Sequence, residues 1–89
     1  MMPDPNSSVR IDVYSRPECH LCDEAKIVIE RVRQHYNFSL RVINIEDDPA
    51  LEAAYGTEIP VVFINGNKAF MYRVDEAELT RLVERLWKA

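Results

Sequence analysis

The sequence predicts an α/β fold, a four-stranded mixed sheet flanked by three helices in the order βαβαββα. Apolar residues recur in successive segments with the period of a strand or of a helix. A Cys-x-x-Cys pair follows the first strand segment, and an Asn-Gly dipeptide separates the last two. The 89 residues, 47% hydrophobic and 29% charged, suffice for one compact core but not two. We therefore expect a single domain over residues 9–89.

The N-terminal region divides into a tail and a strand. Residues 1–8 contain prolines, serines and an asparagine without a periodic apolar residue, which predicts a flexible tail. Val9, Ile11 and Val13 then alternate with polar residues, the pattern of a strand. This strand leads through Tyr14 towards the cysteines.

The next segments predict a helix and a second strand. Apolar residues recur at helical spacing from Leu21 to about Tyr36, with acidic residues early and arginines late, as the helix dipole favours. Asn37 closes this helix. The run from Leu40 to Ile45 is rich in branched aliphatic residues and predicts a largely buried strand. A strand, helix and strand of these lengths predict a right-handed parallel unit.

Two further helices have local start or stop signals. Asp48 can cap a two-turn helix over Pro49 to Tyr55, which Gly56 ends. Asp75 can cap the last helix, and Glu78 can complete a capping box. The apolar face of that helix consists of Leu79, Leu82, Val83, Leu86 and Trp87.

A hairpin lies between these two helices. Pro60 lacks an N–H and can only begin the strand that follows, Val61 to Ile64. Asn65-Gly66 is a strong signal for a tight turn, which pairs this strand with Ala69 to Met71.

Charge and hydropathy exclude several classes of function. The formal net charge is -4 and the acidic residues are spread along the chain, which argues against nucleic acid or an anionic membrane as partner. We find no membrane-length apolar stretch, and the first residues lack the pattern of a signal peptide. We therefore expect a cytoplasmic protein. Thiols are kept reduced there, so a lone Cys-x-x-Cys is more typical of catalysis or metal binding than of a structural disulfide.

Cys19 and Cys22 are the candidate catalytic residues. At a strand-to-helix junction with two residues between them, their sulfurs can form a disulfide without much backbone movement. The start of the helix favours a thiolate at Cys19, whereas acidic Glu18, Asp23 and Glu24 oppose it. His20 is either a solvated residue or, when protonated, a group that assists the thiolate.

These features resemble a known superfamily. The element order, the Cys-x-x-Cys after the first strand and Ile59-Pro60 before the third strand resemble thioredoxins, and residues 14–22 are most similar to small glutaredoxin-like proteins. The resemblance implies a thioredoxin-like fold and a cis Ile59-Pro60 peptide facing Cys19. It also implies that the Ile59 backbone pairs with substrate and that Arg16 can meet a glutathione carboxylate. Arg16, His20, Ile59 and Pro60 are thus the candidate substrate-binding residues.

The sequence departs from glutaredoxins at two places. His20-Leu21 stands where glutaredoxins carry Pro-Tyr between the cysteines, so their redox potential does not carry over. The paired glycine that helps glutaredoxins hold glutathione before the last helix is missing from residues 70–75. Glutathione therefore stays an open candidate as co-substrate.

The function we predict is thiol–disulfide oxidoreduction in cell redox homeostasis. Cys19 attacks a disulfide in a protein or small molecule, and Cys22 resolves the mixed disulfide. The chemistry needs no bound cofactor or metal. A protein or small-thiol reductant regenerates the dithiol, and we expect a monomer.

Two other classes of function stay open. One is an iron–sulfur cluster or metal-binding module assisted by glutathione, and the other is a redox-inactive protein-binding domain. A structural zinc site needs four ligands, and the two cysteines with His20 and the distant His35 do not make a convincing set.

Overall fold

The computed structural model describes residues 9–87, so the predicted tail over residues 1–8 lies outside the described residues. The elements are β1 (Arg10–Ser15), α1 (His20–Arg33), β2 (Ser39–Asn44), the 3-10 helix η1 (Ile45–Asp47), α2 (Pro49–Tyr55), β3 (Val61–Ile64), β4 (Asn67–Met71) and α3 (Glu76–Trp87). The predicted order of strands and α-helices is confirmed. Within residues 9–87, no helix has the length and apolar character needed to cross a membrane.

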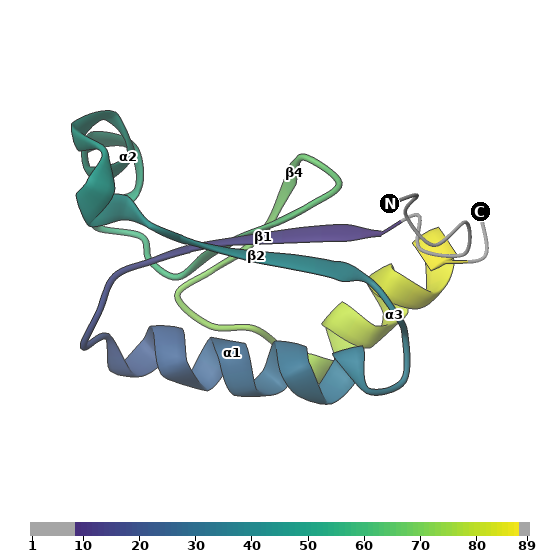
Figure 1. Cartoon of the computed structure of the whole chain (residues 1–89). Helices are drawn as coiled ribbons and strands as arrows, with labels where there is room; N and C mark the ends of the chain where they lie inside the picture. The colour runs from purple at the N-terminus through teal and green to yellow at the C-terminus, as the bar shows by residue number, and fades with distance from the viewer. Residues whose placement is uncertain (1–8, 88–89) are drawn as a thin grey trace.

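The four strands form one mixed sheet in the order β2-β1-β3-β4. β1 pairs parallel with β2 and antiparallel with β3, and β3 pairs antiparallel with β4. Figure 1 shows α1 and α3 on the same side of this sheet, with α2 at the end where β1 leads into α1. The predicted mixed sheet with helices around it is confirmed.

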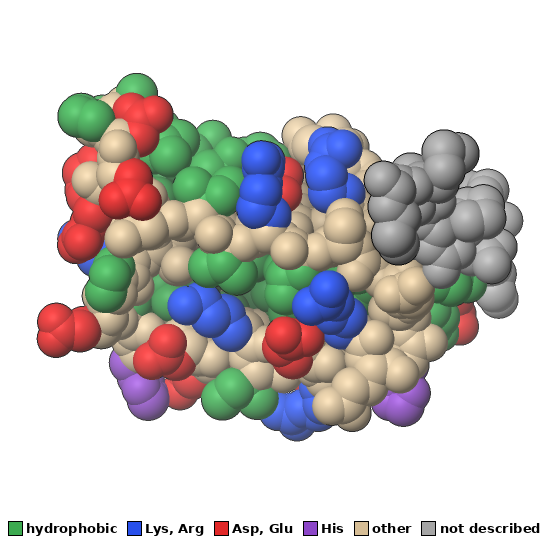
Figure 2. All heavy atoms as spheres, viewed as in Figure 1, with side chains coloured by type: hydrophobic (Ala, Val, Ile, Leu, Met, Phe, Trp, Pro, Cys, Tyr) green, Lys and Arg blue, Asp and Glu red, His purple; other side chains and the backbone are tan. Residues whose placement is uncertain are grey.

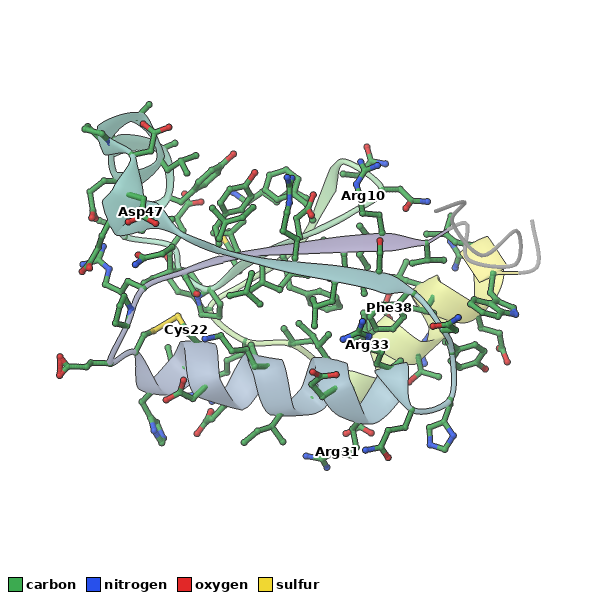
Figure 3. The ribbon with its side chains drawn as sticks, viewed as in Figure 1. Arg10, Cys22, Arg31, Arg33, Phe38 and Asp47 are labelled. Carbon is green, nitrogen blue, oxygen red and sulfur yellow. A yellow bond between two sulfur atoms is a disulfide. The ribbon has the colours of Figure 1, made fainter. Side chains whose placement is uncertain are left out.

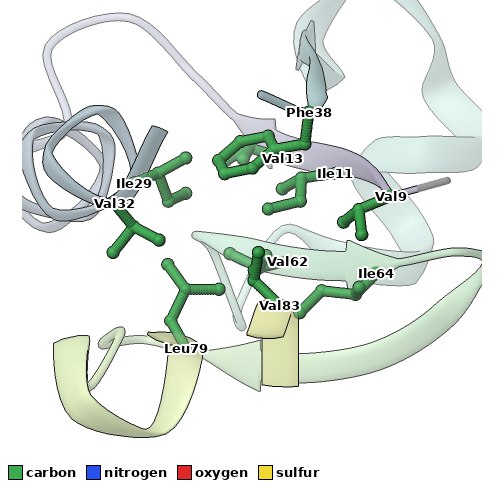
Figure 4. Packing of buried hydrophobic residues seen from close by; sticks show 10 residues of the cluster. All are labelled: Val9, Ile11, Val13, Ile29, Val32, Phe38, Val62, Ile64, Leu79 and Val83. Atoms are coloured by element: carbon green, nitrogen blue, oxygen red, sulfur yellow. The ribbon is translucent and has the colours of Figure 1, made fainter. Parts of the chain in front are cut away.

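The core lies between the sheet and the pair α1 and α3 (Figure 4). Alternate residues of β1 and β3 point to this face, and they meet one apolar stripe from each helix. Fully burying one such aliphatic side chain stabilises the fold by about 1.5–3 kcal/mol. The buried residues of this cluster are Val9, Ile11, Val13, Ile29, Val32, Phe38, Val62, Ile64, Leu79 and Val83.

The prediction that the second strand is largely buried is wrong. β2 is an edge strand that pairs only with β1, and Val42 at its centre is 47% exposed. The predicted strand also extends one residue too far. The Asn44 side chain accepts a hydrogen bond from the Glu46 N–H, which turns Ile45 into η1 instead of continuing the strand.

The first helix ends earlier than its apolar pattern predicts. Its C-cap is Gln34, three residues before the predicted stop at Asn37. The Tyr36 N–H still donates to the Val32 carbonyl at 3.2 Å, and its hydroxyl donates to Glu84 of α3 while its ring centroid lies 5.9 Å from that of Trp87. Tyr36 therefore continues the helical spacing of apolar residues because it packs against α3, although α1 itself ends before it.

The predicted caps of the other helices form in part. Asp48 accepts a hydrogen bond from the Ala50 N–H at 2.9 Å, and Asp75 accepts one from the Glu78 N–H at 3.0 Å. The carboxylate of Glu78, however, pairs with Arg81 one turn later. The predicted capping box is therefore only half formed.

The predicted hairpin is confirmed. Asn65 and Gly66 have φ values of 51° and 84°, and two successive positive φ angles match the strand twist across a tight turn. β4 begins directly after them at Asn67, two residues before the predicted start at Ala69.

Candidate active site

The two cysteines lie at the start of α1, joined by a disulfide. Cys19 is the N-cap, with φ -110° and ψ 111°, and its sulfur accepts a hydrogen bond from the Cys22 N–H at 3.3 Å. The Cα atoms lie 5.2 Å apart, within the ordinary range for a disulfide. Cys22 is fully buried and Cys19 is partly exposed. Figure 3 shows Cys22 and the disulfide at the first turn of α1, on the side that faces the sheet.

The residue before Cys19 has an unusual backbone conformation. Glu18 has a φ of 58°, in the left-handed region that costs a residue with a side chain about 1–2 kcal/mol. Such a conformation persists only where surrounding contacts impose it. The turn that delivers Cys19 is therefore held by tertiary contacts, not by local preference.

The segment with Ile59 and Pro60 leaves the sheet at the same end as the cysteine turn. Tyr14 near the end of β1 pairs with Val61 at the start of β3, so the residues after one and before the other emerge together. The Ile59-Pro60 peptide bond is cis, the isomer that the resemblance implies, and Pro60 is buried.

One backbone N–H, on the residue directly after β4, fixes this segment. Tyr72 donates to the carbonyl oxygens of Pro60 at 2.9 Å and of Glu58 at 3.3 Å. Ile59 lies between these acceptors, and within residues 9–87 its own N–H and C=O form no hydrogen bond. Tyr72 has a φ of 71°, so it too is held in the left-handed region. The backbone groups of Ile59 are thus open while those on either side are engaged.

Arg16 is tied to the end of α2. Its Nη2 donates to the Glu52 carboxylate and, at 3.2 Å, to the Gly56 carbonyl oxygen. Its Nε is buried without a hydrogen-bond partner among the described residues. The carboxylate that Arg16 meets in the structure is therefore that of Glu52, where the resemblance implied that of glutathione.

His20 and Arg73 share one carboxylate beside the cysteines. Glu24 Oε2 lies 2.9 Å from His20 Nε2, and Glu24 Oε1 lies 3.6 Å from Arg73 Nη1. The His20 side chain is 85% exposed, and exposed pairs of this kind contribute about 1 kcal/mol or less. A cavity of about 140 Å³ lies beside them, between α1 and residues 72–74.

Acidic side chains gather at the end of the molecule that carries α2 and the start of α1, as Figure 2 shows. Glu18 and Asp23 are exposed beside the cysteines, and Asp47 and Asp48 are exposed between β2 and α2. The N-terminus of α1 favours a thiolate at Cys19, and these carboxylates act against it. The environment of the thiol therefore combines two opposed electrostatic effects.

Among residues 9–87, no group of three or more His, Cys, Asp and Glu side chains is arranged to hold a metal ion.

Sequence reasoning missed three residues that organise this region. Glu52 and Gly56 contact Arg16 across 36 and 40 residues of sequence, and no local pattern links them. Gly56 was expected only as a helix stop, and it is the C-cap of α2. The third is Tyr72, whose backbone donation to the Ile59 segment depends on the strand register.

The comparison with known families settles the family of this chain. Residues 10–84 match the family described as "Glutaredoxin-like domain (DUF836)". The chain belongs to this glutaredoxin-like family.

Relatives of this glutaredoxin-like protein agree with the assignment. A thioredoxin of Methanocaldococcus jannaschii is 28% identical over 82 residues, which cover 89% of this chain and 96% of the relative. Protein Ne2328 from Nitrosomonas europaea has a TM-score of 0.76 at 26% identity, covering 92% of this chain and 99% of its own. Target protein XcR50 from X. campestris has a TM-score of 0.71 at 29% identity, covering 84% of this chain and 96% of its own. The protein is a thioredoxin-like redox protein with its cysteine pair at disulfide distance.

Proposed function

We propose that this protein is a dithiol–disulfide oxidoreductase that reduces disulfides in proteins or small molecules. One observation carries the proposal: Cys19 at the helix start is partly exposed, and Cys22, one turn later, is fully buried. An incoming disulfide can reach only the first sulfur, whereas the second lies within bonding reach of the first. This division suits a nucleophile and a resolving thiol.

The reaction proceeds in two exchanges. The Cys19 thiolate attacks one sulfur of the substrate disulfide, and the other sulfur leaves as a thiolate that takes up a proton. Cys22, after losing its proton, attacks the Cys19 sulfur of the mixed disulfide and releases the second substrate thiol. The substrate gains two electrons and two protons, and the protein is left with the Cys19–Cys22 disulfide. A dithiol or two small thiols must then return two electrons to the protein.

Ile59 is the substrate-binding residue that this proposal uses first. Its N–H and C=O are unpaired among the described residues, whereas the neighbouring carbonyls of Glu58 and Pro60 are engaged. An extended substrate segment can pair with those open groups, a mode that recognises backbone and tolerates varied side chains. This supports a protein disulfide as the substrate class.

The reductant we propose is a protein or a small thiol other than glutathione. Tyr72 and Arg73 are exposed where glutaredoxins keep a glycine pair, and Arg16 is occupied by Glu52. The chemistry requires no bound cofactor. We further propose that the protein acts as a monomer in the cytoplasm, where thiols are kept reduced.

A redox titration together with a turnover assay tests the function. We expect the purified protein to be colourless, to titrate as a two-electron couple and to reduce insulin in the presence of a reductant. The potential of the couple, within about -270 to -120 mV for this superfamily, identifies it as a reductant or an oxidant. A brown protein with cluster absorbance, or one that reduces no disulfide, would contradict the proposal.

A further inference from the structure

We infer that Arg16 is a positioning residue that fixes the Ile59 segment for protein substrates. This inference rests on the proposed function and assigns to Arg16 a role other than glutathione binding. Arg16 lies three residues before Cys19, and its second acceptor, Gly56, lies three residues before Ile59. The arginine thus connects the two segments that border the site.

The contacts of Arg16 join the end of β1 to α2 at two points. The residue follows β1 directly, and its Nη2 donates both to the Glu52 side chain in the first turn of α2 and to the backbone carbonyl at the C-cap of that helix. A hydrogen bond that involves a charged group is stronger and more directional than a neutral one. The C-terminal end of α2 is also where the helix dipole favours a positive charge. Both effects hold the chain at Gly56 against the cysteine turn.

Gly56 is required at this contact for space. Its φ of -54° is open to any residue, so backbone freedom is not the reason for glycine. A Cβ there would lie 2.5 Å from the Glu52 carbonyl oxygen and 3.3 Å from Arg16 Nη2. A side chain would therefore push the arginine and the segment apart.

The Ile59 segment is held from both of its ends. Arg16 binds the Gly56 carbonyl at the first end, and the Tyr72 N–H binds the carbonyls on either side of Ile59 at the second. With both attachments in place, the open N–H and C=O of Ile59 keep one orientation. Loss of Arg16 releases the Gly56 carbonyl and leaves that end with the backbone hydrogen bonds of the Gly56 and Glu58 N–H groups, while the Tyr72 attachment remains.

The contact is not typical of a pair that serves stability alone. The buried Nε of Arg16 lacks a partner among residues 9–87, and an unpaired buried N–H is destabilising. We infer that Arg16 serves to hold the Ile59 segment in position. Position matters because a misplacement of about 1 Å at a reacting group can lower a rate by roughly a hundredfold.

A comparison of two disulfide substrates tests whether Arg16 acts by positioning the Ile59 segment or by a general effect on the cysteines. Insulin offers a peptide backbone to Ile59, whereas bis(hydroxyethyl) disulfide offers none. We expect Arg16→Met, which keeps much of the side-chain length without its donors, to lower kcat/KM for insulin by roughly tenfold, mostly through KM. The rate with the small disulfide and the rate of Cys19 alkylation should change less than twofold, since neither uses Ile59.

Two more variants and one control complete the test. Glu52→Gln, which removes the charge partner of Arg16 in nearly the same shape, should shift insulin KM in the same direction. Arg16→Lys, which retains one cationic donor, should restore part of the loss. Arg81→Gln removes an exposed ion pair within α3 and should match the wild type. Equal losses with both substrates, or a loss in Arg16→Met but not in Glu52→Gln, would overturn the inference.

Hydrogen exchange tests the positioning without any substrate. The Glu58 N–H donates to the Tyr55 carbonyl at 2.8 Å inside the segment, and the Asn65 N–H donates to Arg10 at 2.8 Å far from it. In Arg16→Met the Glu58 amide should exchange faster, and the Asn65 amide should not change. Unchanged exchange at Glu58 would overturn the positioning role. A wild type that reduces neither disulfide would instead contradict the proposed function.

Discussion

The two ends of this molecule are stabilised by different means. The core beneath the sheet consists of aliphatic and aromatic side chains that are at most 4% exposed. The cysteine end is held by the disulfide, single hydrogen bonds and exposed or partly exposed ion pairs, and it contains two strained residues, Glu18 and Tyr72. Strain of this kind persists only where the surrounding fold imposes it. The comparison teaches that the core provides most of the stability of the fold. The cysteine end contributes less stability, and its strained backbone is held in position by the rest of the fold.

Removal of the thiols gives the largest effect and leaves the core untouched. Cys19→Ser should reduce disulfide reduction to background, because the attacking sulfur is gone. In Cys22→Ser, Cys19 should still attack the substrate disulfide. The mixed disulfide should then accumulate, visible by intact mass, because the resolving thiol is missing. Alkylation of the reduced wild type near neutral pH should label Cys19 first. Preferential labelling of Cys22 would reverse the assignment of the two thiols.

A cavity in the core should lower stability and leave the reactivity of the thiols unchanged. Leu79 is fully buried, so Leu79→Ala should lower the free energy of unfolding by about 2–5 kcal/mol. The folded fraction should retain the wild-type rate of Cys19 alkylation. Ile27→Ala, at a position 58% exposed on α1, is the matched control and should change stability by about 0.5 kcal/mol or less. Chemical denaturation measures both, and a small effect of Leu79→Ala would show that the core is not the main source of stability.

The strained backbone at Tyr72 predicts which reductant recycles the protein. The oxidised wild type should be recycled more slowly by glutathione with glutathione reductase than by a thioredoxin reductase. Tyr72→Gly should raise the glutathione rate several-fold, because glycine adopts this positive φ freely and leaves the backbone open to close approach. Met71→Ala, at the neighbouring exposed position, is the control. Wild-type turnover by glutathione equal to that by the reductase would refute this prediction.

The smallest effect concerns the contact that closes the far end of α1. The hydrogen bond from Tyr36 to Glu84 raises the pKa of Tyr36 above its ordinary value of 10.0, and burial and the Glu84 charge act in the same direction. Because the folded pKa lies above the unfolded one, the contribution to stability is complete below about pH 10 and is lost as the pH rises through the folded pKa. Tyr36→Phe should therefore melt slightly below the wild type at neutral pH. The difference should shrink in alkaline buffer, and a difference that grows there would contradict the assignment.

Short-range signals in the sequence determined much of the fold. The caps at Asp48 and Asp75, the turn at Asn65-Gly66 and the cysteines at a helix start each depend on residues within one turn of one another. Such contacts form from local backbone geometry, so the pattern of residue types is enough to predict them. The parallel strand-helix-strand unit and the hairpin together predicted a mixed sheet, and the family resemblance implied the cis peptide.

Only the tertiary structure decided the features that depend on distant partners. β2 has the composition of a buried strand, but its position at the sheet edge exposes Val42. Arg16 meets Glu52 and Gly56 because β1 and α2 end at the same side of the sheet, not because of any spacing in the chain. Burial and hydrogen-bond partners are properties of the packed molecule, and residues some forty positions apart carry no local sign that they will meet.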